Sequence, residues 1–308
     1  MNRFIRLRLL AMLLCLPFLL IFISGCGSSS QKKDEPPVYS PLQVLVPEAT
    51  GKATLGSSPM ILDVSNISQG YFIVQSDSSD LTCSLQIISP SGVLYSYFIA
   101  PGESATITFT EGSGDYTITG YQQVQGDQYA ALYSETVTVQ LENDFLPFLY
   151  PNQYVNFTPD SKASQLALSM IDEDTVDVDA LQQIYDYVVS NLTYDYEKAD
   201  TVTTGYLPDV DETLETGTGI CFDYAALTTA MLRSCDIPCK LQIGYAGDIK
   251  HAWIDVYIRS KGWVNQAVSF KGDTWTLMDP TFDSNSDDKE AIQDYIGDES
   301  NYTVQFTR

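Results

Sequence analysis

Basic residues are scarce in this 308-residue sequence, which has 16 Lys and Arg against 40 Asp and Glu and a formal net charge of −24. Nucleic-acid binding depends on Lys and Arg to displace phosphate counterions, so this composition argues against it. The same charge argues against electrostatic adsorption on an anionic bilayer. An acidic surface favours amine-rich or Lys-rich partners, although the simpler interpretation is that it keeps the protein soluble.

Cysteine and histidine are also scarce, with six cysteines and one histidine in the whole chain. The cysteines do not form paired Cys-x-x-Cys units, so the sequence indicates no zinc site. Cys83 stands alone in a strand-like segment. Cys235 and Cys239 flank a short turn and could form a disulfide in an oxidising compartment, but small buried thiols are the favoured interpretation.

The acidic run Asp283–Asp288 resembles the start of a calcium-binding loop. Such a loop needs glycine at its sixth position and glutamate at its twelfth, where this chain has Asp288 and Asp294. The run is therefore predicted to be a solvated turn before a helix at Glu290–Ile296. We expect no bound metal and no cofactor.

The first 25 residues are predicted to be an export signal that is not part of the fold. Three arginines precede the apolar stretch Leu9–Ile23, which is too short for a membrane span. The segment Ile23-Ser24-Gly25-Cys26 resembles the lipobox of bacterial lipoproteins, in which the cysteine after the cleavage site is lipidated. An ordinary cleaved signal and an uncleaved anchor are the alternatives. We therefore expect an extracytoplasmic protein held at the membrane by lipid on Cys26.

Cleavage before Cys26 would leave a formal charge of 13 − 40 = −27, because the removed segment carries three basic and no acidic residues. Residues 26–40 are then predicted to be a flexible tether, since Ser, Pro and charged residues dominate them.

Residues 41–150 are predicted to form an antiparallel β-sandwich domain. Short runs rich in Val, Ile, Thr, Tyr and Phe are separated by turn clusters such as Ser89-Pro90-Ser91-Gly92. The expected strands are Gly70–Val74, Leu85–Ile88, Val93–Ile99, Ala105–Phe109, Tyr116–Tyr121 and Glu135–Leu141. The region lacks histidine and its acidic residues are scattered, so nothing in it suggests catalysis.

Residues 151–308 are predicted to form a second domain of α+β class, because helical patterns come first and strand patterns follow. The expected helices are Ser161–Ile171, Asp179–Asn191 and Phe222–Cys235. The expected strands are Leu241–Tyr245, His251–Ile258, Trp263–Phe270 and Trp275–Met278. The spacing of Leu181, Ile184, Tyr185 and Val188 predicts one buried face on the second helix.

Three residues of this second region, in order, favour catalysis by a thiol. A thiol needs a neighbouring base, and that base needs a third group to orient it. Cys221 follows a glycine-containing loop at a helix start, where free N–H groups and the helix dipole favour an anion. His251 opens a strand 30 residues later, and Asp279 follows another strand after 28 more. Taken singly, each has an ordinary explanation: a buried thiol, a bystander histidine and a turn-forming aspartate.

The motifs around these residues resemble the transglutaminase-like superfamily over about residues 160–300. The matching segments are Gly219-Ile220-Cys221-Phe222-Asp223-Tyr224-Ala225-Ala226-Leu227, Arg233 with Ile237-Pro238, His251-Ala252-Trp253-Ile254-Asp255-Val256-Tyr257, and Trp275 with Asp279-Pro280-Thr281.

This resemblance implies a papain-like α+β core, with helices packed on an antiparallel sheet, and a Cys221–His251–Asp279 triad acting on protein or peptide amides. Cys221 would attack the carbonyl, His251 would transfer the proton, and Asp279 would orient the imidazole. The Cys221 N–H and one further donor would hold the oxyanion. Tyr194 is a candidate for that donor, although core packing explains a tyrosine there equally well.

The sequence also departs from the family pattern. Asp236 stands where the family has glycine after the helix, a position that Asp tolerates in a left-handed cap. Residues 264–274 lengthen the interval between His251 and Asp279, which predicts an extra hairpin and leaves Asp255 and Asp273 as rival orienting groups. Phe222 replaces the tryptophan of animal cross-linking enzymes, whose calcium sites have no counterpart in this sequence.

The sequence therefore favours a membrane-anchored cysteine acyltransferase or amidohydrolase. Hydrolysis is slightly favoured over transfer to an amine, because water needs no dedicated acceptor site. The alternative is a non-catalytic surface lipoprotein that uses its β-sandwich to recognise a partner.

Overall fold

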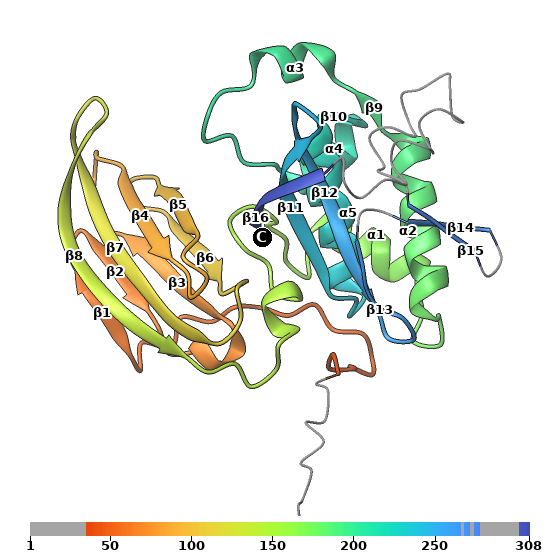
Figure 1. Cartoon of the computed structure of the whole chain (residues 1–308), viewed down its shortest axis with the longest axis horizontal. Helices are drawn as coiled ribbons and strands as arrows, with labels where there is room; N and C mark the ends of the chain where they lie inside the picture. The colour runs from red at the N-terminus through yellow and green to blue at the C-terminus, as the bar shows by residue number, and fades with distance from the viewer. Residues whose placement is uncertain (1–34, 266–267, 272–273, 278–301) are drawn as a thin grey trace, which may run out of the picture. The chain divides into compact units, whose positions relative to one another are not determined.

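The computed structural model describes residues 35–265, 268–271, 274–277 and 302–308 (Figure 1). Cys26, Asp279, the acidic run Asp283–Asp288 and the helix predicted at Glu290–Ile296 lie outside the described residues. The described residues belong to one compact unit, in which antiparallel β sheets come first and a mixed α and β part follows. No helix of this part of the chain is long and apolar enough to cross a membrane.

Two four-stranded antiparallel sheets form the N-terminal part (Figure 1). The first sheet has the order β1 (Thr54–Ser57), β2 (Met60–Asp63), β3 (Tyr71–Ser76), β6 (Ser104–Thr108). The second has the order β5 (Leu94–Ile99), β4 (Cys83–Ile88), β7 (Gly114–Gln125), β8 (Gln128–Val139). Both sheets contribute side chains to one buried hydrophobic cluster, and the short 3-10 helices η1 (Ile67–Gln69) and η2 (Leu146–Phe148) belong to the connections.

Alternation along β5 shows why these segments are strands. Tyr95, Tyr97 and Ile99 are buried, whereas Leu94 and Phe98 are exposed. Since successive side chains of a strand point to opposite faces, a period of two buries one face in the shared core. The prediction of antiparallel N-terminal strands is confirmed, and each of the six expected runs overlaps an observed strand.

The prediction missed β1 and β2 and shortened the β7–β8 hairpin. Strands β1 and β2 have four residues each, too few for a periodic pattern to stand out. Strands β7 and β8 have 12 residues each and are joined at Gly126-Asp127, where Gly126 has a φ of 52°. Their outer ends lie largely outside the core, so no alternation of buried and exposed positions reveals them.

The C-terminal part contains helices packed on an antiparallel sheet. The helices are α1 (Lys162–Met170), α2 (Asp177–Asn191), α3 (Tyr196–Thr201), α4 (Val210–Thr216) and α5 (Cys221–Ser234). The sheet has the order β13 (Gly262–Val264), β12 (Ile249–Ile258), β11 (Cys239–Ala246), β16 (Tyr302–Thr307). Two pairs stand apart: β9 (Thr193–Tyr194) with β10 (Thr218–Gly219), and β14 (Val268–Lys271) with β15 (Thr274–Leu277).

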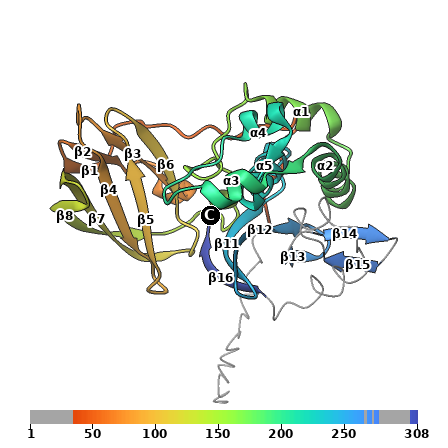
Figure 2. The same cartoon turned by 90° about the horizontal axis from the view of Figure 1, so that it is seen from above.

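Helix α5 is the centre of this part, and α1, α2, α4, β11 and β12 all pack against it (Figure 2). Every residue from Asp223 to Ser234 is buried. Arg233 is fully buried near its end and donates hydrogen bonds to the carbonyls of Cys239, Tyr150 and Arg308. Burial lowers the pKa of Arg233 to about 10. A charge taken out of water needs such acceptors, so Arg233 fixes three separate segments around the helix.

Strand β12 follows the expected alternation. Ala252, Ile254 and Val256 belong to the hydrophobic cluster shared with α5, whereas His251 and Trp253 make ring contacts with each other. A hairpin follows β13, in which Val268–Lys271 pairs with Thr274–Leu277 in antiparallel register. It does not lie within residues 264–274 as predicted, because its second strand includes most of the strand predicted separately at Trp275–Met278. The prediction of one strand over Trp263–Phe270 is wrong, since β13 pairs with β12 and β14 pairs with β15.

Asp236, the second residue after α5, lies in the left-handed region with a φ of 58°, and among the described residues it is the only non-glycine with a positive φ. The expectation that Asp adopts a left-handed cap there is confirmed. Its Oδ2 accepts a hydrogen bond from the Tyr39 N–H at 3.1 Å, while Arg259 donates to its carbonyl. Burial raises the pKa of Asp236 to about 6.

Candidate active site

Cys221 is the first residue of α5 and is partly exposed, whereas Cys83, Cys235 and Cys239 are buried; all four are free. The interpretation of Cys235 and Cys239 as buried thiols is confirmed, and burial raises the pKa of each to about 12. A neutral thiol is a poor nucleophile, so these two are unsuited to attack at neutral pH. Cys221 is the cysteine of the described chain that a reagent can reach.

The loop before Cys221 contains two glycines at positions that do not suit other residues. Gly217 ends α4 with a φ of 62°. A Cβ on Gly219 would lie 2.7 Å from the Cβ of Asp223, so only glycine fits there. Ile220 is extended, with φ −97° and ψ 173°, and its carbonyl accepts from the N–H groups of Asp223 and Tyr224. The chain therefore turns into the helix directly at the thiol.

Asp223 lies in the first turn of α5 and is fully buried. Its Oδ2 accepts a hydrogen bond from the Ile220 N–H at 2.8 Å. The same oxygen is 2.8 Å from Lys198 Nζ, and its Oδ1 accepts from the Tyr206 hydroxyl at 2.5 Å. Sequence reasoning missed this network, although an acidic residue in the first turn of a helix was a visible signal for a capping role.

The two partners of Asp223 respond to its charge. Burial is the largest cause of a rise in the pKa of Tyr206 to about 12, and the bond to Asp223 adds to it. Burial alone would lower the pKa of Lys198, but its interactions with Asp223 and Tyr206 raise it overall. Lys198 Nζ also lies 4.6 Å from the centre of the Tyr206 ring. The charge of the carboxylate is thus balanced by a cation, and a hydroxyl donates a hydrogen bond to it, both from outside its own helix.

His251 is buried on β12, with 6% of its surface exposed, directly opposite Gly244 on β11. Its ring stacks with Trp253 at 6.2 Å and lies 6.4 Å from Tyr302. A Cβ on Gly244 would lie 1.9 Å from the Thr303 carbonyl oxygen, so glycine is required for β16 to pass beside this position. Sequence reasoning missed Tyr302, because its neighbour His251 is far away in the chain.

Alternation places His251 on the face of β12 that also carries Trp253 and Asp255, opposite to Ala252 and Ile254. Asp255, a rival orienting group, is buried and accepts a hydrogen bond from Gln242 Nε2 at 2.6 Å. The other two carboxylates considered for this role, Asp273 and Asp279, lie outside the described residues.

Tyr194, the candidate oxyanion donor, belongs to β9. It pairs with Gly219 of β10 in parallel register, and the Asp195 N–H donates to the Gly219 carbonyl at 2.9 Å. The Tyr194 ring contacts the Tyr196 ring at 5.0 Å. The residue is therefore on the segment that runs beside the approach to Cys221.

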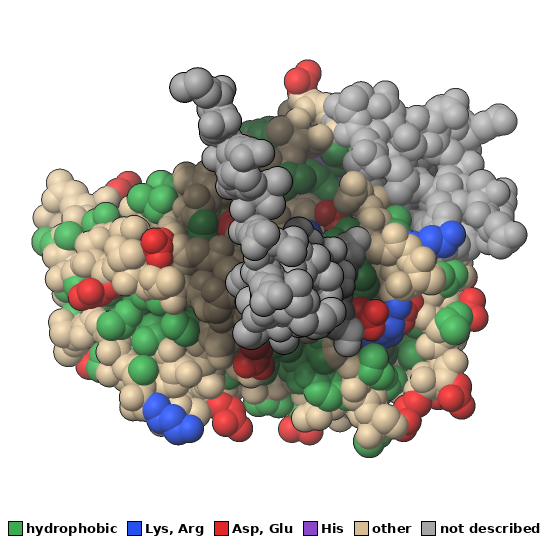
Figure 3. Space-filling model, turned by 60° about the horizontal axis from the view of Figure 1, so that its bottom comes forward, with side chains coloured by type: hydrophobic (Ala, Val, Ile, Leu, Met, Phe, Trp, Pro, Cys, Tyr) green, Lys and Arg blue, Asp and Glu red, His purple; other side chains and the backbone are tan. Residues whose placement is uncertain are grey.

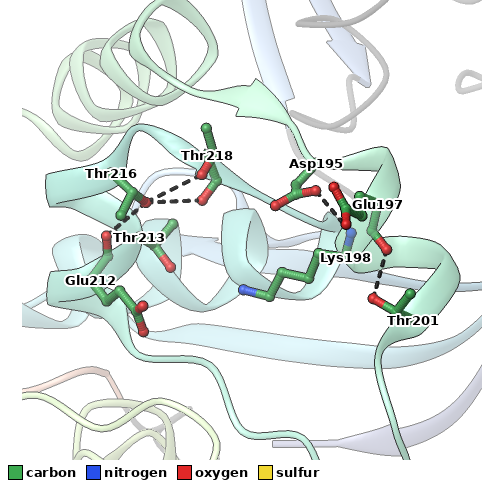
Figure 4. Close-up of a pocket in the computed structure, with 8 residues that line it drawn as sticks. All are labelled: Asp195, Glu197, Lys198, Thr201, Glu212, Thr213, Thr216 and Thr218. Carbon is green, nitrogen blue, oxygen red and sulfur yellow. Dashed lines mark hydrogen bonds between the residues drawn. The ribbon is translucent and has the colours of Figure 1, made fainter.

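A polar pocket of about 380 Å³ lies beside α3, α4 and β10 (Figure 4). Its lining residues are Asp195, Glu197, Lys198, Thr201, Glu212, Thr213, Thr216 and Thr218. Cys221 and His251 are not among them. Acidic side chains are also more evident than basic ones on the face of the molecule drawn in Figure 3.

Residues 164–280 match the transglutaminase-like superfamily. This segment includes Cys221, His251 and Asp279, together with α5 and β12. The chain therefore contains a transglutaminase-like superfamily domain, preceded by antiparallel β sheets, and its fold is mixed α+β. No curated protein matches the chain.

Several solved structures are similar to the chain at low identity. A candidate cysteine protease from Cytophaga hutchinsonii is 18% identical, covers 83% of this chain and 84% of its own, and gives a TM-score of 0.38. The periplasmic domain of TgpA from Pseudomonas aeruginosa is 14% identical, covers 74% of this chain and 95% of its own, and gives a TM-score of 0.33. Red sea bream transglutaminase is 15% identical, covers 70% of this chain and 48% of its own, and gives a TM-score of 0.26.

Proposed function

We propose that the protein is a cysteine acyltransferase or amidohydrolase that acts on protein or peptide amides, with Cys221, His251 and Asp279 as its catalytic triad. The observation that carries this proposal is the place of Cys221: a partly exposed thiol at the first residue of the central helix of a transglutaminase-like domain. The first N–H groups of a helix have no partner within it, so they favour an anion at that point.

The proposed reaction begins when His251 accepts the thiol proton and the Cys221 sulfur attacks the amide carbonyl. The resulting oxyanion is stabilised by the Cys221 N–H and a second donor, for which Tyr194 is the candidate. Collapse of the intermediate expels the amine, which takes its proton from His251, and leaves a thioester on Cys221. Asp279 orients the imidazole throughout; Asp255 is the alternative in that role.

The thioester is resolved by water or by a second amine. Water gives hydrolysis, as in a protease or a deamidase, whereas a Lys amine gives a new amide bond. We favour hydrolysis because water needs no acceptor site. The reaction needs neither a metal nor a cofactor, because acid–base and nucleophilic groups of the chain supply each step.

We further propose that the enzyme works outside the cytoplasm, with Cys26 carrying the lipid that holds it at the membrane and residues 26–40 acting as a tether. In this proposal residues 41–150 and 151–308 are its two domains, the first of them a β-sandwich and the second with a papain-like core. The acidic composition argues against a nucleic-acid substrate.

Competitive labelling with iodoacetamide tests the proposed nucleophile. Peptide mapping should show Cys221 alkylated much faster than Cys83, Cys235 and Cys239 at neutral pH. Substitution of His251→Ala should slow alkylation of Cys221 by at least about tenfold, which corresponds to about 1.4 kcal/mol. Tyr257→Phe, on the same strand and face, serves as the matched control and should leave the rate unchanged.

The role of His251 is the decisive part of this test, because His251 has to take the thiol proton if Cys221 is an activated nucleophile. Unchanged alkylation of Cys221 in His251→Ala would refute the activated thiol and favour a non-catalytic surface protein that recognises a partner through its β sheets.

A further inference from the structure

The carboxylate of Asp223 is buried two residues after the proposed nucleophile, and the reaction proposed above gives it no role. Its three partners come from three places: the Ile220 N–H just before Cys221, Lys198 on α3, and Tyr206 in the loop before α4. A fully buried carboxylate is costly unless it is paired and hydrogen-bonded. Here both carboxylate oxygens have polar partners, which offset the cost of burying the charge.

The bond from Ile220 controls the backbone at the thiol. The Ile220 N–H is held by Asp223 Oδ2, and the Ile220 carbonyl is held by the N–H groups of Asp223 and Tyr224. With both of its polar groups fixed, Ile220 has little freedom in the peptide that joins it to Cys221. That peptide carries the Cys221 N–H, which is the proposed oxyanion donor.

The other two partners bring a distant segment to the same point. Asp195 caps α3 by accepting from the Lys198 N–H at 2.8 Å, so the helix that carries Lys198 is itself anchored. The Tyr206 ring contacts the Phe222 ring edge-on at 6.3 Å, directly after the nucleophile. Residues 198–206 are therefore tied to the first turn of α5 at two side chains.

The charge of Lys198 has a specific role in this arrangement. An unpaired carboxylate two residues from Cys221 would oppose formation of a thiolate, since like charges repel strongly where water is excluded. Lys198 cancels the charge of Asp223 at 2.8 Å, and 30% of its side chain is exposed against none for Asp223. Because Lys198 is paired with it, the Asp223 carboxylate can accept the Ile220 N–H without destabilising a thiolate on Cys221.

From these contacts we infer that Asp223, Lys198 and Tyr206 form a positioning group for Cys221. The carboxylate fixes the peptide before the thiol, Lys198 neutralises its charge, Tyr206 donates a hydrogen bond to it, and both partners hold residues 198–206 in place. This inference rests on the proposed function and assigns residues outside the triad to the same reaction. None of the three needs to touch the substrate; they act through the backbone of Ile220 and the electrostatics around the thiol.

A glutamine-mimicking peptidyl diazo-ketone probe, which alkylates an activated thiol after binding, separates positioning from binding. Tyr206→Phe removes one hydroxyl and keeps the ring against Phe222, and Lys198→Met removes the charge. Each should lower the maximal inactivation rate by about tenfold, which corresponds to about 1.4 kcal/mol, and change the half-saturating concentration by less than about twofold. Lys198→Arg keeps the charge and should restore the rate to within about threefold of the wild type.

Tyr196→Phe on the exposed side of α3 and Lys162→Met at a surface ion pair are the matched controls. Both should retain the wild-type inactivation rate. Asp223→Asn should show a loss at least as large as that of Tyr206→Phe; if it does not fold, Tyr206→Phe and Lys198→Met still decide the question.

The two possible failures are distinct. A wild-type protein whose Cys221 resists the probe would overturn the proposed function and this inference together. A reactive wild type, with wild-type inactivation rates in Tyr206→Phe and Lys198→Met, would overturn the positioning role alone. A loss in Lys198→Met that Lys198→Arg does not restore would also overturn the electrostatic part of the inference.

Discussion

The N-terminal sheets and the C-terminal transglutaminase-like part bury different kinds of side chain. Before residue 150, no described Asp, Glu, Lys, Arg or His is buried. In the described residues after that point, the buried members of this group are Asp223, Arg233, Asp236, His251, Asp255 and Arg308. Since burial of a charge is costly without partners, the contrast separates a part that is held together by apolar packing from one that maintains polar arrangements.

The N-terminal core is held together by apolar packing. Its cluster consists of residues such as Phe72, Leu85 and Ile118, contributed by both sheets. Its buried tyrosines are neutral: burial is the first cause that raises the pKa of Tyr97 to about 12. Such a core stabilises the fold without any group suited to proton transfer at neutral pH. The comparison therefore assigns the proposed chemistry to the C-terminal part.

Removal of the proposed nucleophile should give the largest difference between the two parts. Cys221→Ala should lower the hydrolysis of a glutamine-containing peptide by about 10⁴-fold or more, because no other group forms the thioester. Ammonia release with mass analysis of the peptide measures it. Cys83→Ala, in the N-terminal core, is the control and should keep activity within about twofold while unfolding at a lower urea concentration. Equal loss of activity in both variants would contradict the assignment.

Loss of the buried guanidinium should give the largest change in stability. Arg233→Met leaves the carbonyls of Cys239, Tyr150 and Arg308 without their donor, so we expect the free energy of unfolding to fall by about 3–5 kcal/mol. Urea denaturation followed by tyrosine and tryptophan fluorescence measures it. Exposed Lys52→Met in the N-terminal part should change stability by less than about 0.5 kcal/mol. A loss below about 1 kcal/mol in Arg233→Met would show that its hydrogen bonds are dispensable.

Asp236 should make stability depend on pH. Its pKa is about 6 in the folded protein against an ordinary 3.8, so between these values the folded state holds more protons than the unfolded state. The free energy of unfolding therefore falls as pH rises from about 4 to about 6 and is level above that range. Asp236→Asn retains a side chain that suits a left-handed φ and removes the ionisation.

The free energy of unfolding of Asp236→Asn minus that of the wild type should consequently be about 1–3 kcal/mol larger at pH 7 than at pH 3.5. Urea titrations at the two pH values give this difference. Exposed Asp160→Asn is the control and should show no such gain. A difference between Asp236→Asn and the wild type that stays constant with pH would contradict the raised pKa.

A conservative change in the N-terminal core should give the smallest effect. Ile118→Val removes one buried methylene, so we expect a loss of about 0.5–1.5 kcal/mol in stability. Peptide hydrolysis should remain at the wild-type rate, because the change leaves the polar arrangement of the other part intact. A several-fold fall in activity, measured where the variant is fully folded, would show that the N-terminal core does influence the site.

Much of the fold could be predicted because its signals are local. The period of two in β5 and β12 and the helical spacing of Leu181, Ile184 and Tyr185 report which face each element buries. The glycines before Cys221 and the aspartate at position 236 indicated their turns for the same reason: a backbone conformation restricts the residue that adopts it. The start of α5 at Cys221 was one residue from the predicted boundary.

The polar arrangement around Cys221 could not be predicted in this way. Lys198 and Tyr206 lie in a segment with little hydrophobic pattern. They meet Asp223 in a part of the fold where β9, just before α3, pairs with β10, just before α5. The pairing of β16 with β11, which brings Tyr302 to His251, likewise joins residues 56 to 65 positions apart in the chain.

By itself the sequence determined the order of the elements, the faces that they bury, and the presence of a thiol at a helix start, since each follows from the conformational and solvation preferences of neighbouring residues. The tertiary structure alone decided which distant groups pair with Asp223 and which strand passes beside His251. Such contacts form only when packing brings remote segments together, and no local preference records which partner a side chain will meet.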